Sequence, residues 1–177
     1  MGLITGPDAT GEAGAFDQAT AVIQVGDGRY DMRPDPRFAP ETASGGTQSA
    51  VNGGVLIAAM LRAVLDTSPH PYPVVTNAHF LHVPAIAPAR IGVTWLKHGK
   101  TAAVARVSLS QDGAPMIEAM VATGALPDPA GLVTAGTPES LSWTGRPPEL
   151  PPVGDCVEVA AAGGLRGQVD LRLDPAT

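Results

Sequence analysis

The longest apolar run of the chain leads into residues 55–65, which are hydrophobic on nearly every side of a predicted helix. A helix with that pattern belongs in the interior of a protein. Its charges are limited to Arg62 and Asp66, which stand four residues apart near its end, and Pro69 and Pro71 follow. Proline cannot continue a helix, so the pattern predicts one buried helix that stops before residue 69.

Four segments after this helix have the composition of β-strands, namely 73–83, 90–97, 101–111 and 115–126. Apolar residues alternate with polar ones in the second and third segments, so one face of each strand packs inward. Turn signals such as His98-Gly99 and Asp112-Gly113 separate the segments. Short turns join consecutive antiparallel strands, so we expect these four segments to form an antiparallel meander.

The part of the chain before the helix adds further strands to this picture. Residues 16–32 suit two short strands or one hairpin around Gly26-Asp27-Gly28. The order is then strand, buried helix and four more strands. This order predicts an α+β fold in which a curved antiparallel sheet wraps around one central buried helix.

The same pattern divides the chain into four parts. We expect a flexible arm over 1–15, one folded domain over 16–126 and a Pro-, Gly- and Thr-rich linker over 127–154. The segment Gly28–Pro36 reappears as Gly167–Pro175, with Gly, Asp, Arg, Asp and Pro shared in register. Such a repeat predicts that 155–177 begins a second copy of the same fold. Chance similarity in a chain of narrow composition is the alternative.

Composition and charge limit the partners. A formal net charge of −6 makes the chain repel phosphate backbones and anionic membranes, so we expect neither nucleic acid nor membrane as a partner. The single cysteine, Cys156, and four unclustered histidines offer no disulfide and no metal site, and we expect no cofactor. No signal-peptide pattern opens the sequence, so we expect a cytoplasmic protein. Aromatic residues make up only 4%, and the small side chains either leave room for a ligand or simply reflect an Ala-rich composition.

The start of the helix is the first candidate site. Asn52, Gly53 and Gly54 can present backbone N–H groups at the positive end of the helix dipole, and glycine lets a ligand approach the backbone closely. Such a site polarises a carbonyl group. The alternative for Asn52 is an N-cap that only satisfies the helix's own donors.

His79 is the second candidate, as a general acid or base or as a hydrogen-bond donor to a carbonyl. His79 and His82 lie three apart in a predicted strand, so their side chains point to opposite faces and cannot share one substrate. A structural or surface histidine is the alternative for His79. Glu118 is the one acid at a position that could be enclosed, although a solvent-facing edge position opposite Arg106 or a neighbour of Arg106 suits it better.

Two stretches carry a family resemblance. Residues 52–63, Asn-Gly-Gly-Val-Leu-Ile-Ala-Ala-Met-Leu-Arg-Ala, and 73–84, Pro-Val-Val-Thr-Asn-Ala-His-Phe-Leu-His-Val-Pro, resemble the hotdog-fold acyl-CoA thioesterases of the TesB-like, double-hotdog type. Residues 99–107 and 113–121 fit the next strands of that pattern. The resemblance covers most of residues 16–126, which corresponds to the first of the two halves.

The resemblance implies a thioester hydrolase of fatty acid metabolism that binds an acyl-CoA or acyl-carrier thioester. Gly53 and Gly54 match the helix start that faces the thioester carbonyl, and His79 with Phe80 matches the strand beside the acyl tunnel. Asn52 and His79 are therefore the catalytic candidates, and Asn52, Gly53, Gly54, His79 and Phe80 are the substrate-binding candidates. In the family, an Asp, a Thr or Ser and a Gln of the second half activate the water, and no segment of this sequence matches them.

Two other functions stay open at this stage. A non-catalytic acyl-binding or assembly half would be stable only when its sheet edge meets another copy, and we expect such a homo-oligomer to form through strand pairing. A hotdog dehydratase ranks last, because that family places a histidine before the helix and an acid on it.

Overall fold

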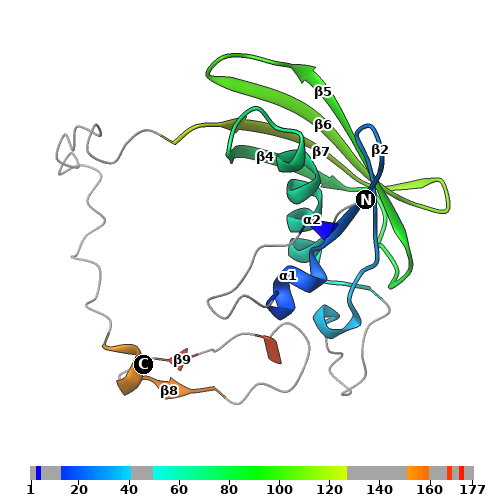
Figure 1. Ribbon diagram of the computed structural model, residues 1–177. Helices are drawn as coiled ribbons and strands as arrows, with labels where there is room; N and C mark the ends of the chain where they lie inside the picture. The colour runs from blue at the N-terminus through cyan, green and yellow to red at the C-terminus, as the bar shows by residue number, and fades with distance from the viewer. Residues whose placement is uncertain are drawn as a thin grey trace.

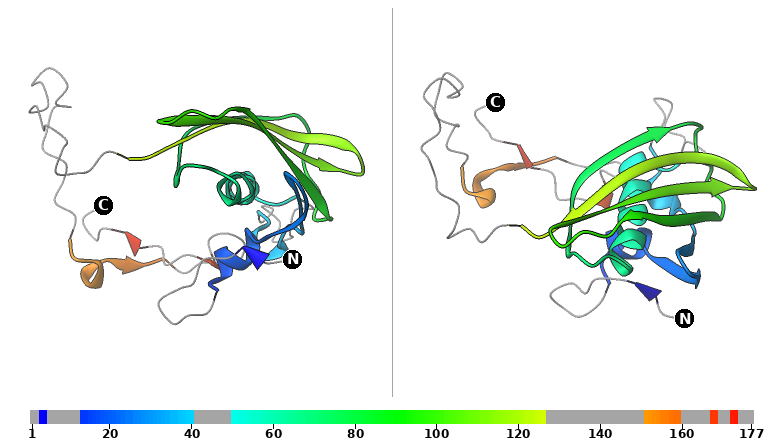
Figure 2. Two further views of the ribbon diagram at one scale, coloured as in Figure 1. Left: turned by 45° about the horizontal axis from the view of Figure 1, so that its top comes forward. Right: turned by 90° about the horizontal axis from the view of Figure 1, so that it is seen from above.

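One long helix, α2 (Gly53–Asp66), lies in the hollow of a curved antiparallel sheet (Figure 1). The computed structural model describes residues 3–4, 13–40, 50–126, 151–159, 167–168 and 172–173. The sheet has seven strands in the order β1-β2-β3-β5-β6-β7-β4. They are β1 (Leu3–Ile4), β2 (Val22–Gly26), β3 (Arg29–Met32), β4 (Tyr72–Phe80), β5 (Ala89–Lys97), β6 (Ala102–Gln111) and β7 (Ala114–Gly124). The predicted α+β architecture, a sheet wrapped around one helix, is confirmed (Figure 2).

Helix α2 begins two residues earlier than the apolar run indicated, because Asn52 caps it. The Asn52 side-chain oxygen accepts a hydrogen bond from the Gly54 N–H at 2.8 Å. The helix is not buried on every side as predicted, because the sheet covers only one of its faces. The face toward the sheet is fully buried, and it consists of Val55, Leu56, Ala59, Met60, Ala63 and Val64.

The two charges of α2 have different partners. Arg62 forms an ion pair with Asp17, and Asp66 accepts a hydrogen bond of 2.8 Å from the buried Tyr30 hydroxyl. The C-terminal half of α2 is thereby fixed to the segment that precedes the helix in the chain.

The predicted four-strand meander is wrong in one respect. Strands β5, β6 and β7 do form a meander, but β4 pairs with β7 and not with β5. The 8-residue connection 81–88 carries the chain from β4 across to the opposite side of β6 and β7. Strand β4 is therefore an edge strand, and its outer edge has no strand partner among the described residues. It also ends at Phe80, three residues before the predicted boundary.

The segment before α2 combines a helix with a hairpin. Residues Ala15–Ala19 form a short helix, α1, where the sequence suggested a strand. The Phe16 ring packs against Phe38 with ring centroids 6.2 Å apart, and tertiary contacts of this kind override local propensity. The hairpin of β2 and β3 follows as predicted, and its turn needs Gly28. Gly28 has a φ of +60°, and a Cβ atom there would lie 2.5 Å from the Val93 carbonyl oxygen.

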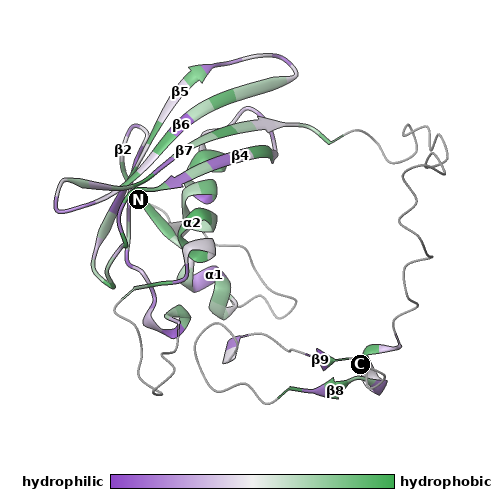
Figure 3. Ribbon diagram, turned by 180° about the vertical axis from the view of Figure 1, so that it is seen from behind, coloured by the Kyte–Doolittle hydropathy of each residue, from purple (hydrophilic) through white to green (hydrophobic). Residues whose placement is uncertain are grey.

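Alternation along the strands builds the core. The inward residues Ala103, Ala105, Val107 and Leu109 of β6 are fully buried, and the residues between them are more exposed. Figure 3 shows the apolar colouring of α2 against the sheet. Burying a Leu or Val side chain contributes about 1.5–3 kcal/mol, so this layer of apolar side chains dominates the stability of the domain.

The structure describes only fragments of the predicted repeat and linker. A 3-10 helix spans Val153–Asp155, and β8 (Val157–Glu158) pairs antiparallel with β9 (Arg172–Leu173). The predicted linker lies mostly outside the described residues, as do the predicted arm and most of the repeated segment Gly167–Pro175. A second copy of the fold over 155–177 stays a prediction.

Candidate functional site

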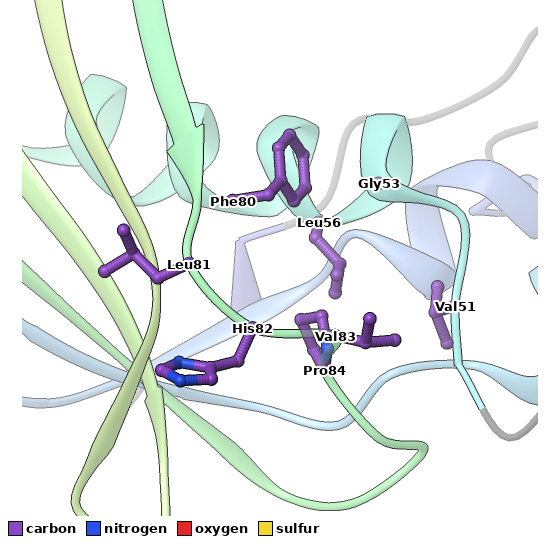
Figure 4. Close-up of a pocket in the computed structure, with 8 residues that line it drawn as sticks. All are labelled: Val51, Gly53, Leu56, Phe80, Leu81, His82, Val83 and Pro84. Carbon is purple, nitrogen blue, oxygen red and sulfur yellow. The ribbon is translucent and has the colours of Figure 1, made fainter.

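An apolar cavity of about 250 Å³ opens between the first turn of α2 and the segment that follows β4 (Figure 4). It is lined by Val51, Gly53, Leu56, Phe80, Leu81, His82, Val83 and Pro84. Only Gly53 and Phe80 of this set were candidates from the sequence. The others come from two segments, 51–56 and 81–84, that are far apart in the sequence and meet only in the fold.

Two polar side chains hold the segment after β4 in place, and neither was predicted to do so from the sequence. Gln111 is buried at the end of β6, accepts a hydrogen bond from Ala85 N–H and donates to the carbonyls of Ala85 and Ala87, each at 2.9 Å. His82 makes a ring contact of 3.0 Å from Nδ1 to the Pro115 carbonyl. A carbonyl only accepts, so Nδ1 carries the proton. Gln111 had a sequence signal, because it continues the inward register of β6 with a polar residue.

The helix start supplies the polar part of the cavity. The Asn52 N–H donates to the Phe38 carbonyl at 3.1 Å, which fixes the cap residue to the preceding loop. Because the Asn52 side chain already accepts from Gly54, the N–H of Gly53 is the one at this turn without a partner among the described residues. The Gly53 N–H lies at the positive end of the helix dipole and suits an oxygen that carries partial negative charge.

Phe80 lies against Gly53. A Cβ atom on Gly53 would come within 2.9 Å of two atoms of the Phe80 ring, so only glycine allows this close approach. The structure thus brings together Asn52, Gly53, Gly54 and Phe80, four of the five residues predicted to bind substrate.

His79 does not join them. Successive side chains of a strand point to opposite faces, and Phe80 points toward α2, so His79 points to the outer face of the sheet. There it stands opposite Glu118 of β7, whose carboxylate is 4.0 Å from the Arg106 guanidinium. Glu118 itself stands opposite Ser108 of β6, a neighbour of Arg106 on the same face of that strand, and its contact with Arg106 is diagonal. A contact of His79 with a ligand in this cavity would require a different strand register.

The charges near the cavity are few. The first turn of α2 has no acidic residue, and no group of three or more metal-ligating side chains occurs in the described part of the chain. Among the described residues, the group with the strongly shifted pKa lies at the far end of α2: burial and the hydrogen bond to Asp66 raise the pKa of Tyr30 to about 12. Tyr30 is fully buried and stays protonated over the physiological range. The cavity is therefore an apolar site with the Gly53 N–H at its rim.

No helix in the described ranges is long and apolar enough to cross a membrane.

Comparisons with known proteins agree with this geometry. Residues 42–124 match the family of acyl-CoA thioesterase N-terminal domains. A solved structure from Thermobifida fusca YX, provisionally assigned as a thioesterase II, is 28% identical with a TM-score of 0.72, and the match covers 92% of this chain and 55% of that one. No curated protein matches the sequence.

Two further solved structures share the fold. A conserved protein of unknown function with a hot dog fold, from Alicyclobacillus acidocaldarius, is 20% identical with a TM-score of 0.64, and the match covers 89% of this chain and 53% of that one. The TesB protein of Mycobacterium avium subsp. paratuberculosis is 22% identical with a TM-score of 0.51, and the match covers 62% and 41%. The chain thus spans about half the length of these three solved structures. The predicted hotdog fold is confirmed.

Proposed function

Because residues 42–124 match the family model of acyl-CoA thioesterase N-terminal domains, we propose that the chain takes the acyl tail of a thioester into the cavity at the start of α2. The observation that carries this proposal is the meeting of an apolar cavity with the N–H of Gly53 at a helix N-terminus. An acyl thioester has the matching chemistry, because its apolar tail adjoins a carbonyl oxygen that accepts a hydrogen bond.

The proposed reaction is hydrolysis of the thioester. Water adds to the carbonyl carbon, the C–S bond breaks, and the thiol leaves with a proton. The carbonyl oxygen gains negative charge during the addition, and the Gly53 N–H at the positive end of the helix stabilises that charge. The proton of the water needs a base, and neither the first turn of α2 nor the lining of the cavity contains a carboxylate.

We propose that this base comes from a second hotdog unit beside this one. His82 is the one titratable residue in the lining, and its ring is held at the Pro115 carbonyl and points away from the helix start (Figure 4). His79, the candidate base from the sequence, lies on the outer face of the sheet. Asn52 caps α2 and positions the Gly53 N–H, so its proposed role is to shape the oxyanion site.

The edge strand β4 supports pairing with such a second unit. It is nine residues long, and the large apolar residues exposed on it and just after it are Tyr72, Val74, Val75, Phe80, Leu81 and Val83. An exposed apolar edge strand is a template for pairing with another strand. We expect a homo-oligomer by light scattering, and we expect Val75→Lys to shift it toward the monomer. A protein that is already monomeric at micromolar concentration would contradict this proposal.

Thiol release from acyl-CoAs tests the hydrolysis. The chain is assayed alone and as a fusion in which a second hotdog unit follows Thr177. Activity of the chain alone that falls at least tenfold in Asn52→Ala would support a complete site built by copies of this chain. Activity only in the fusion would place the base in the second unit. No activity in either protein would refute the hydrolase proposal.

The second candidate function is acyl binding without hydrolysis, which the carboxylate-free cavity favours. Binding of an acyl thioester that survives unchanged for hours would favour this candidate over the hydrolase. A dehydratase is disfavoured, because every histidine of the chain follows α2 in sequence.

The carrier of the acyl group and the compartment are part of the same proposal. We propose coenzyme A as the carrier, since the family match names it, and comparison of acyl-CoA with the same acyl group on a carrier protein tests that choice. We propose a cytoplasmic location, which fractionation of cells that produce the protein would check.

A further inference from the structure

We infer that Phe80 sets the length of acyl chain that the cavity accepts, and that the limit lies near ten carbon atoms. This inference rests on the proposed function and adds a substrate class to it. The cavity measures about 250 Å³. An engineered cavity of about 150 Å³ in another protein takes up benzene, so by proportion about ten carbon atoms fit here. Medium-chain acyl groups are therefore the substrate class.

The walls of the cavity differ in how firmly they are held. Leu56 is fully buried in the core, Val51 is 6% exposed, and Pro84 is buried. Side chains held on all sides by close packing do not move to admit a longer ligand. Phe80, in contrast, is 54% exposed. The fixed walls define the floor of the cavity, and Phe80 is the large wall that can move.

The contact of Phe80 with Gly53 places this movable wall beside the helix start. Figure 4 shows the Phe80 ring over the first turns of α2, with Leu56, Val83 and Pro84 on the other side of the cavity. The ring packs so closely on Gly53 that a Cβ atom there would lie 2.9 Å from it. The aromatic pairs among the described residues are Phe16 with Phe38 and Trp95 with His98, so no ring contact there restrains Phe80.

A tail that fills the cavity has two ways to grow longer. It can displace the Phe80 ring, or it can pass Val83, which is 79% exposed, into water. The first way loses the contact of the ring with Gly53, and the second buries no further apolar surface. Each added methylene should therefore tighten binding by about fourfold until the cavity is full, and by little afterwards.

Calorimetric binding of S-alkyl coenzyme A thioethers tests the inference, because these ligands keep the tail and cannot be hydrolysed. Chains of 4, 6, 8, 10, 12 and 14 carbons are compared. We expect the affinity to rise to about ten carbons and then level off. In Phe80→Ala the levelling point should move at least two carbons higher. Phe80→Leu, which keeps an apolar side chain, should move it less and serves as a second variant if alanine impairs folding.

Met120→Ala is the matched control, because Met120 is an exposed apolar residue on the outer face of β7, away from the cavity. In Met120→Ala the affinity should level off at the same chain length as in the unaltered protein. Affinity that keeps rising through 14 carbons in the unaltered protein would refute the length limit but leave the proposed function intact. An unchanged levelling point in both Phe80 variants would refute the role of Phe80. No binding at any length would refute the proposed function itself.

Discussion

Replacing Gln111 with leucine should loosen the wall of the cavity. The Gln111 side chain is 5% exposed and makes three hydrogen bonds of 2.9 Å to the backbone of Ala85 and Ala87. These bonds tie the 81–88 connection to the end of β6. Leucine has a similar volume and fills the space, so Gln111→Leu removes the hydrogen bonds without opening a void.

The expected loss of stability follows from the number of hydrogen bonds that are removed. Each hydrogen bond contributes about 1 kcal/mol net, and three give about 3 kcal/mol. The added apolar contact of leucine offsets part of this loss, so we expect a decrease of about 2–3 kcal/mol in the free energy of unfolding. At about 2–4 °C per kcal/mol for a chain of this length, Tm falls by about 4–12 °C.

Urea unfolding followed by circular dichroism measures this change. Ser110→Ala is the matched control, because the neighbouring Ser110 hydroxyl has one long bond of 3.4 Å to the Arg90 carbonyl and should contribute less than about 0.5 kcal/mol. At 25 °C, where Gln111→Leu is still folded, it should also bind an S-alkyl coenzyme A more weakly. A stability loss no larger than that of the control would show that the 81–88 connection holds its shape without Gln111.

Three further substitutions, two of them paired with a control variant, probe the two ends of α2 and the turn between β2 and β3. Tyr30→Phe should lower the free energy of unfolding by about 1–2 kcal/mol at pH 7, measured by circular dichroism. Burial and the carboxylate hydrogen bond raise the pKa of Tyr30 from 10.0 to about 12, so the unfolded chain loses the hydroxyl proton at a lower pH than the folded protein does. The unaltered protein should therefore lose stability between pH 10 and 12, and this loss should be absent from the variant. Parallel pH curves would contradict this linkage. Asn52→Ala should lower the free energy of unfolding in urea by about 1 kcal/mol, and Asn52→Asp should lower it much less, since only alanine removes the cap. Equal losses in the two variants would argue against capping. Gly28→Ala should lower the free energy of unfolding by about 2–4 kcal/mol, because it adds a clash with the Val93 carbonyl to an unfavourable φ. Gly113 is the control, because it has a φ of +82° but open space around it, and Gly113→Ala should lower the free energy of unfolding by about 1 kcal/mol. Equal melting temperatures of the two variants would contradict the clash.

The sequence predicted those parts of the fold that depend on neighbouring residues. Alternation marked the strands around 90–97 and 101–111 nearly to the residue, and the apolar run with Asn52 before it marked α2. The pairing of β4 was missed, because the partner of an edge strand is set by the path of the 81–88 connection and not by its own residues. Helix α1 was missed because its formation depends on contacts with Phe38 and Arg62.

The site was predictable only at the helix start. Asn52 and the two glycines after it form a local pattern whose geometry follows from helix capping. In the following strand, alternation implied that His79 and Phe80 face opposite sides, but not which of them faces the helix. The walls formed by Val51 and Pro84 could not be predicted, since they depend on two loops that meet in the fold.

The two ends of the sheet differ, and the difference governs how large an assembly can become. At one end β1 contributes only two residues, whereas β4 at the other end contributes nine. If β4 pairs with its own counterpart across a two-fold axis, each molecule uses its one long edge and growth stops at two copies. Pairing of β4 with β1 would instead repeat without end and build a filament, and an edge of two residues offers too few hydrogen bonds to support it.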